Sequence, residues 1–134
     1  MFVWVVEKEL ARGRRPGYSG ERGKQVLKVE VDEWLSEVKA FGVRSVICLL
    51  GPDQLHLYDA LPGGLIEYYR ASGLEVAHIP VQDHQRPAMT DNDLANVWAA
   101  YSKLTGPVLI HCSAGVDRTG MAVAYIRRQL AQFA

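Results

Sequence analysis

A cysteine and an arginine, separated by five residues, stand in the segment HCSAGVDRTG, residues 111–120. The segment follows the apolar run PVLI and precedes MAVAYIRRQL, a pattern typical of a loop between a buried strand and a helix. Backbone N–H groups at such a junction can point inward and form an anion-binding hollow against the helix N-terminus. Gly115 and Gly120 allow the backbone angles and close approach that this hollow requires. Arg118 adds a planar fork that matches two oxygens of a phosphate or sulfate.

Cys112 lies at the base of the predicted hollow, where the positive field favours the thiolate form. A thiolate that faces a bound phosphoryl group is a nucleophile in line for displacement. We expect the loop to bind this group through residues Ser113, Ala114, Gly115, Val116, Asp117 and Arg118.

Displacement also needs an acid that protonates the leaving oxygen. Asp83 in HIPVQDHQRP is the best candidate, because it follows a predicted strand and lies in a loop flanked by prolines. Asp91 and Asp93 are the competing candidates. Both are explained better as first-turn and capping residues of the next helix.

The segment resembles the signature of the cysteine-dependent protein tyrosine phosphatase superfamily, through His111, Cys112, Arg118, Thr119 and Gly120. The resemblance implies that Cys112 is the nucleophile and that Arg118 binds the phosphate and the transition state. It also implies that the Thr119 hydroxyl stabilises the thiolate as leaving group and that His111 supports the cysteine. The family places its acid on a loop at a similar interval before the cysteine, which agrees with Asp83.

The opening FVWVVEKELARGRRPG and the segment IPVQD are similar to small atypical dual-specificity phosphatases of the VHZ type. Two departures from that pattern matter. Small members usually continue for one or two helices beyond the loop helix, and those helices often carry a glutamine thought to orient the hydrolytic water. Here neither Gln129 nor Gln132 stands in a matching context. Asp117, directly before the arginine, also resembles the loop ending of some bacterial and myotubularin-like lipid phosphatases.

We therefore predict a phosphomonoester hydrolase, of the protein tyrosine or dual-specificity type, that works through a cysteinyl-phosphate intermediate. The alternatives are a phosphoinositide or other non-protein phosphatase, and a pseudophosphatase that binds phosphate without turnover. A rhodanese-like sulfur transferase also uses a cysteine in a loop, but it does not require the Arg-Thr-Gly sequence that follows here, so we favour the phosphatase. We expect no metal and no cofactor, since Arg118 and the loop dipoles supply the positive charge. The expected partners are phosphorylated proteins or small phosphomonoesters, without nucleic acid or membrane insertion.

Length, composition and charge indicate what kind of protein carries these residues. The chain has 134 residues, 49% hydrophobic and 22% charged, with zero formal net charge, which predicts a single domain over residues 1–134. Two cysteines and no visible signal peptide favour a cytoplasmic protein. The cations of residues 12–28 form a basic edge that either attracts anionic ligands or belongs to a solvated loop.

Alternating strand and helix patterns predict an α/β fold, with a mainly parallel central sheet flanked by helices and the phosphate loop between the last strand and the last helix. We expect strands over 2–6, 26–31, 43–50, 74–81 and 107–111. Helices are expected from Asp32 to Gly42, in two pieces over 55–73, from a capping box at Thr90, and after the loop. In such sheets ligands bind at the carboxyl ends of the strands, where Cys112 falls.

Two further expectations concern Cys48 and the early end of the chain. Cys48 lies near the carboxyl end of its strand, at the edge that also holds Cys112. It is either a packing residue or a resolving thiol that traps oxidised Cys112 as a disulfide, and side-chain alternation leaves both open. Without further helices an apolar patch would stay uncovered, which favours a homodimer or a missing C-terminal segment.

Overall fold

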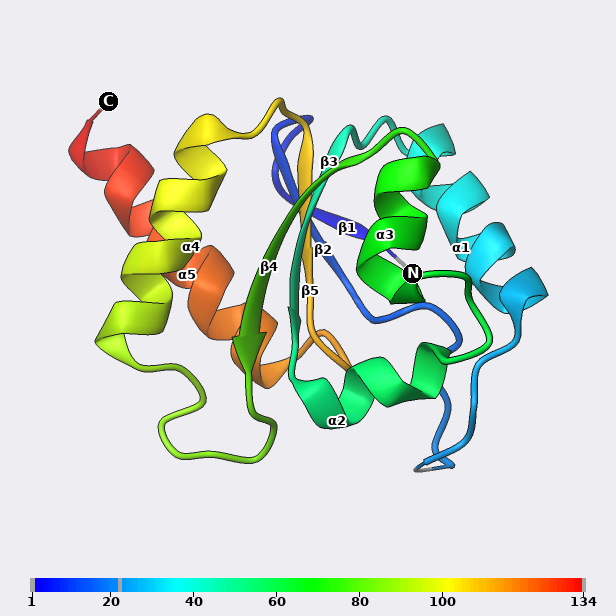
Figure 1. The fold of residues 1–134 in the computed structure, drawn as a ribbon. Coiled ribbons are helices and arrows are strands. Elements are labelled where there is room, and N and C mark those ends of the chain that lie inside the picture. Colours follow the sequence, from blue (N-terminus) through cyan, green and yellow to red (C-terminus); the bar gives the residue numbers. More distant parts are fainter. Residues whose placement is uncertain (1, 22, 134) are drawn as a thin grey trace.

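The computed structural model describes residues 2–21 and 23–133 and contains a five-stranded sheet in the order β1-β2-β5-β3-β4 (Figure 1). The strands are β1 (Val3–Val6), β2 (Leu10–Gly13), β3 (Ser45–Leu50), β4 (Glu75–Val81) and β5 (Val108–His111). The helices are α1 (Lys28–Ala40), α2 (Pro52–Leu55), the 3₁₀ turn η1 (His56–Tyr58), α3 (Gly64–Ala71), α4 (Asp91–Lys103) and α5 (Asp117–Gln132).

Four strands of the sheet run parallel. β5 pairs in parallel with β2 and β3, and β3 pairs in parallel with β4, whereas β1 forms an antiparallel hairpin with β2. The carboxyl ends of β2, β5, β3 and β4 therefore meet at one edge of the sheet. This arrangement confirms the predicted α/β fold with a mainly parallel sheet.

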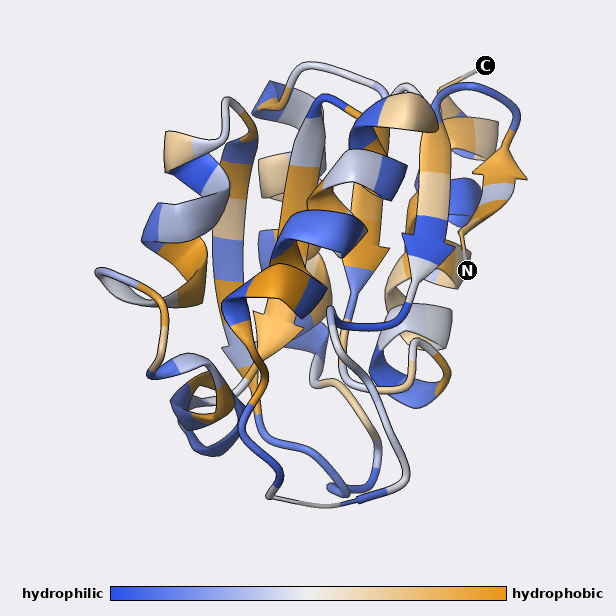
Figure 2. Cartoon of the chain, turned by 90° about the vertical axis from the view of Figure 1, so that its right-hand side faces the viewer, coloured by the Kyte–Doolittle hydropathy of each residue, from blue (hydrophilic) through white to orange (hydrophobic). Residues whose placement is uncertain are grey.

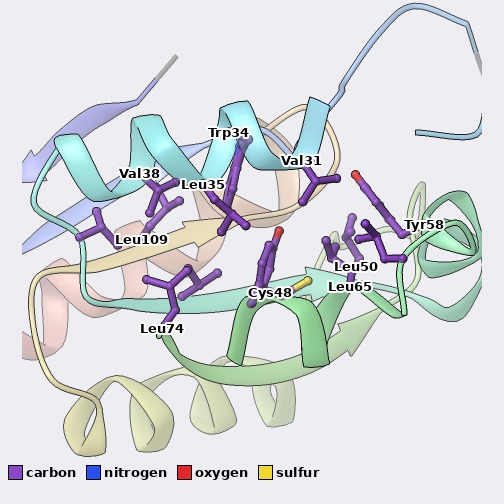
Figure 3. Packing of buried hydrophobic residues seen from close by; sticks show 14 of the residues in the cluster. Val31, Trp34, Leu35, Val38, Cys48, Leu50, Tyr58, Leu65, Leu74 and Leu109 are labelled. Carbon is purple, nitrogen blue, oxygen red and sulfur yellow. The ribbon is translucent and has the colours of Figure 1, made fainter. Parts of the chain in front are cut away.

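Helices cover both faces of the sheet, α1 and α3 on one and α4 and α5 on the other (Figure 1). Strand β3 is buried along its whole length, and its residues alternate between the two cores. Cys48 and Leu50 pack with Trp34 of α1 on the first face (Figure 3), while Ile47 and Leu49 pack into the second. Apolar residues concentrate in the strands, whereas the loops beyond the carboxyl edge are largely hydrophilic (Figure 2).

The strand predicted over 26–31 is wrong, because Lys28 already begins α1. The alternation in VLKVEV imitates a strand. The buried positions Val31, Trp34, Leu35 and Val38 follow helical spacing instead, and this continuous apolar face prevails. The expected cap at Asp32 is wrong for the same reason. Leu27 is the capping position, and its N–H donates to the Glu30 carboxylate at 3.0 Å.

Strand β2 lies in a segment for which the sequence predicts no strand. Only Leu10 and Ala11 are apolar there, so the stretch carries no periodic signal. The parallel register with β5, from Leu10 opposite Val108 to Gly13 opposite His111, holds it in the sheet. Strand pairing over long sequence distance thus decides the conformation of this segment.

The helix predicted in two pieces over 55–73 begins earlier, with α2 at Pro52, and its first piece continues as the 3₁₀ turn η1. The capping box predicted at Thr90 is confirmed. The Thr90 hydroxyl accepts the N–H of Asp93 at 3.1 Å, and the Asp93 carboxylate accepts the N–H of Thr90 at 2.9 Å, which is the predicted capping box of α4. Asp93 therefore acts as a capping residue of α4.

No helix in the described part of the chain is long and apolar enough to cross a membrane.

Candidate active site

The predicted phosphate loop connects β5 to α5. Cys112 follows the strand directly, and α5 begins at Asp117. Gly115 has a φ of +76°, and a Cβ at this position would collide with the carbonyl oxygen of Gly13. The loop can therefore turn against the end of β2 only with glycine at this point.

Arg118 lies beneath the loop with 1% of its surface exposed. Its Nη1 donates to the carbonyl oxygens of Leu49 at 3.2 Å and Val81 at 2.7 Å, at the ends of β3 and β4. Its Nε is buried and has no hydrogen-bond partner among residues 2–21 and 23–133. Buried donors are almost always paired, so this N–H is available to an anion bound in the loop.

Asp83, which follows β4, lies beside this arginine. Its Oδ2 is 3.4 Å from Nη2 of Arg118, and its Oδ1 accepts the N–H of His84 at 3.0 Å. The side chain is about one-third exposed, so it can reach a ligand in the pocket. The structure thus brings the candidate acid and the candidate phosphate-binding arginine into direct proximity.

Gln54 of α2 joins these two groups, and the sequence did not single it out. Its Oε1 accepts a hydrogen bond from Arg118 Nη2 at 2.9 Å, and its Nε2 donates to Asp83 Oδ2 at 3.1 Å. Gln54 follows β3 at the carboxyl edge of the sheet. A polar residue just past a buried parallel strand is the signal that could have found it.

His111 supports the loop from the α1 and α3 face. Burial lowers the pKa of His111 to about 4, so the ring is neutral. The carbonyl oxygen of Cys112, 3.0 Å from Nδ1, can only accept, which places the proton on Nδ1. Nε2 then accepts from the Tyr69 hydroxyl at 2.9 Å, and burial raises the pKa of Tyr69 well above its usual value, so that it remains a donor.

Thr119 lies in the first turn of α5 and is fully buried. Its Oγ1 has no hydrogen-bond partner within the described part of the chain. A hydroxyl in this state carries an O–H that a neighbouring acceptor can use. This is consistent with the role that the family resemblance implies for Thr119.

Two arginines from the end of β2 and the turn after it also contact the loop. Arg12 donates from Nη2 to the carbonyl oxygens of Gly115 at 2.8 Å and Val116 at 3.2 Å. Arg15 is 5% exposed and donates from Nε to the Ser113 hydroxyl at 3.1 Å. Sequence reasoning noticed this basic stretch but did not assign it to the site, because its position depends on the unpredicted β2.

A cavity of about 900 Å³ opens at this edge of the sheet. It is lined by Cys112, Arg118, Asp83, Gln54 and Arg15, together with most of the loop. Ser113, Ala114, Val116 and Asp117 also line it, whereas Gly115 is not a lining residue and packs against the backbone of Gly13. Among the described residues, no group of three His, Cys, Asp or Glu side chains could hold a metal ion.

Cys48 belongs to a different environment from Cys112. Cys48 stands opposite His111 in the β3–β5 register and packs in the core against α1 and α3, whereas Cys112 belongs to the core on the other face. Both thiols are free. Burial raises the pKa of Cys48 to about 12, which keeps it protonated. This geometry favours the packing role of Cys48 over a disulfide with Cys112.

Comparisons with known proteins agree with this geometry. Residues 24–130 match the family model described as polymorphic toxin system, DSP-PTPase phosphatase. The human tyrosine-protein phosphatase non-receptor type 20 is 48% identical over 40 residues, which are 29% of this chain and only 10% of that protein.

Solved phosphatase structures share the fold at low sequence identity. Tk-PTP superposes with a TM-score of 0.60 at 22% identity, over 94% of this chain and 71% of that one. The core catalytic domain of the PP-IP phosphatase SIW14 from S. cerevisiae superposes with a TM-score of 0.59 at 19% identity, over 97% of this chain and 66% of that one. The family match covers most of the sequence, so the chain belongs to the family described as polymorphic toxin system, DSP-PTPase phosphatase.

Proposed function

We propose that this chain hydrolyses phosphomonoesters through a cysteinyl-phosphate intermediate, with Cys112, Arg118 and Asp83 as the reacting residues. The observation that carries this proposal is their convergence on one cavity, with the Nε of Arg118 buried and unpaired among the described residues. A buried guanidinium with a free donor suits a phosphoryl group better than it suits an apolar or cationic ligand.

In the first half-reaction, the loop amides and Arg118 bind the phosphoryl oxygens. The sulfur of Cys112 attacks phosphorus as the bond from phosphorus to the leaving oxygen breaks, and Asp83 gives its proton to that oxygen. Arg118 Nη2, which lies 3.4 Å from Asp83, can turn to the developing charge on the equatorial oxygens.

In the second half-reaction, water attacks phosphorus and the sulfur–phosphorus bond breaks. Its electron pair returns to Cys112. We propose that Thr119 turns its hydroxyl, which is unpaired among the described residues, towards this sulfur. Asp83 accepts the proton of the attacking water. Gln54 positions the carboxylate of Asp83 through its 3.1 Å hydrogen bond.

The substrates that we favour are phosphotyrosine and other aryl phosphates in phosphorylated proteins. Tyr18 lines the cavity and is 37% exposed, and its ring can stack on an aryl group. The printed name of the human relative, a tyrosine phosphatase, agrees with this class. SIW14 is named as a phosphatase of PP-IP, which keeps the non-protein phosphate alternative open to test.

The family description refers to polymorphic toxin systems, and we propose that the domain acts on phosphorylated molecules in the cytoplasm of a target cell. Two free cysteines suit a reducing compartment. The proposal also includes three predictions: a single domain over residues 1–134, a homodimer, and no nucleic-acid partner.

Release of inorganic phosphate from p-nitrophenyl phosphate, phosphotyrosine peptides, phosphoserine peptides and phosphoinositides tests the proposal. We expect multiple turnovers, with the aryl phosphates preferred. A folded protein that binds phosphate and releases none from any of these substrates would identify a pseudophosphatase. Preference for phosphoinositides would instead support the lipid alternative.

A further inference from the structure

We infer that Arg15 forms a second anion-binding subsite beside the phosphate loop, which takes a second phosphoryl group carried by the substrate. The inference rests on the proposed function, since it assigns part of the same cavity. It adds a substrate class, namely molecules with two phosphoryl groups close enough to lie in one pocket.

Arg15 is held rigidly in place. Its backbone N–H donates to the carbonyl oxygen of Ser113 at 2.9 Å, and its Nε donates to the Ser113 hydroxyl at 3.1 Å. Its Nη1 donates at 3.2 Å to the hydroxyl of the fully buried Tyr58, which in turn donates to the carbonyl of Pro16 at 2.6 Å. An arginine fixed in this way loses little conformational freedom when it binds a ligand.

Arg15 has no carboxylate at ion-pair distance within the described ranges. Both of its side-chain hydrogen-bond partners are neutral hydroxyls. A guanidinium that is only 5% exposed is costly to bury without an anion. Arg118 differs, because the carboxylate of Asp83 lies 3.4 Å from it. A ligand can therefore supply the anion that pairs directly with Arg15.

The cavity has space for this second anion. Its volume of about 900 Å³ is far larger than one phosphoryl group needs and is in the range of pockets for drug-sized ligands. Arg15 lines the cavity together with Tyr18, whose ring centroid is 5.5 Å from its guanidinium carbon. Three acids line the cavity. Asp53 and Asp117 are exposed side chains, Asp83 lies beside Arg118, and none of them forms an ion pair with Arg15. A second phosphoryl group can thus approach Arg15 while the first occupies the loop.

The test measures binding of inorganic phosphate and inorganic pyrophosphate by calorimetry in the Cys112→Ser background, in which we expect turnover to be lost. Arg15→Met removes the charge and retains the apolar stem. Arg14→Met is the matched control, because Arg14 carries the same charge and contacts the same Tyr18 ring, also at 5.5 Å, but is exposed. We expect Arg15→Met to weaken pyrophosphate binding at least about tenfold more than it weakens phosphate binding, and Arg14→Met to change the two equally.

Equal loss of both ligands in Arg15→Met would overturn the inference, since it would show that Arg15 only supports the loop through Ser113. Arg15→Lys keeps the charge without the fork and provides a second variant if Arg15→Met fails to fold. We expect it to retain part of the pyrophosphate preference, and an Arg15→Lys protein with no preference in a folded state would also contradict the subsite.

A second set of measurements distinguishes the two sources of such a ligand. Phenyl phosphate is compared with benzene-1,2-bisphosphate, and a singly phosphorylated tyrosine peptide with one phosphorylated at two adjacent tyrosines. An Arg15-dependent gain with either pair supports the subsite and identifies its source, and no gain with both pairs contradicts it. Because binding is measured without turnover, failure of the subsite remains distinct from failure of the proposed hydrolysis.

Discussion

Two regions deliver a buried arginine to the same cavity, and they differ in how a sequence reveals them. The segment 111–118, from the end of β5 through the phosphate loop to the start of α5, carries Arg118 in a contiguous pattern with its nucleophile. The segment that leaves β2 carries Arg15, and only the pairing of β2 with β5 brings that residue to the loop. The comparison shows that chemistry encoded locally can be read from sequence, whereas its supporting contacts depend on the tertiary fold.

The two regions also differ in electrostatics. Arg118 has an acid nearby and an unpaired Nε within the described structure, so we assign it to the reacting phosphoryl group. Arg15 has only hydroxyl partners, so we assign it to a charge at a distance from the reaction. If this division is correct, changes in the loop abolish catalysis, and changes around it alter rate, stability or selectivity by smaller factors.

The largest effect is expected from Cys112→Ser, which should lower turnover of p-nitrophenyl phosphate by at least about 10⁴-fold, because it removes the nucleophile. Serine keeps the loop amides and Arg118, so binding of inorganic phosphate should remain measurable by calorimetry. Substantial residual turnover in this variant would contradict the covalent mechanism.

The second-largest effect is expected from Asp83→Asn. Turnover of phenyl phosphate should fall by about 10²–10³-fold, because the amide cannot protonate the leaving oxygen. The loss on p-nitrophenyl phosphate, whose leaving group needs less protonation, should be clearly smaller. Asp93→Asn serves as the control, since Asp93 caps α4. Equal losses of Asp83→Asn activity on both substrates would remove Asp83 from the role of acid.

The buried His111, at the end of β5, should make the stability of the protein depend on pH. Its pKa in the folded protein, about 4, is below the ordinary value of 6.5, because burial disfavours the charged ring. The unfolded chain therefore takes up a proton near pH 6.5 that the folded chain accepts only near pH 4. Stability should be unaffected by this group above pH 6.5 and should fall by about 2–3 kcal/mol between pH 7 and pH 4.5.

Urea unfolding of the wild type and of His111→Gln at these two pH values isolates this contribution from that of the carboxylates. The fall in unfolding free energy should be smaller in His111→Gln by about 2–3 kcal/mol, whatever the variant's absolute stability. Identical falls in the two proteins would mean that His111 is protonated in the folded state near its ordinary pKa.

The extent of correct sequence prediction follows from the same contrast. The strands β3, β4 and β5 and the capping box of α4 are confirmed, and they rest on signals within a few residues. The prediction of the phosphate loop and of Asp83 as the acid rests on equally local signals. The apolar alternation over 26–31 led to a wrong strand prediction, because most of the apolar face of α1, which continues through Val38, lies beyond these residues. β2, Arg15 and Gln54 could not be predicted, since β2 is defined by strand pairing and the two side chains by contacts with residues distant in sequence.

The smallest effect is expected at Gln54, which tests whether a contact outside the signature contributes to the chemistry. Gln54→Leu keeps the size of the side chain and removes the bonds to Asp83 and Arg118, so the acid loses its orientation while remaining present. We expect a loss of about tenfold, larger on phenyl phosphate than on p-nitrophenyl phosphate, because positioning matters most where protonation limits the rate. In the Asp83→Asn background the same change should have little further effect, since two residues that act through one function are not additive. A Gln54→Leu loss that is equal for both substrates and fully additive with Asp83→Asn would show instead that the amide acts on Arg118 alone.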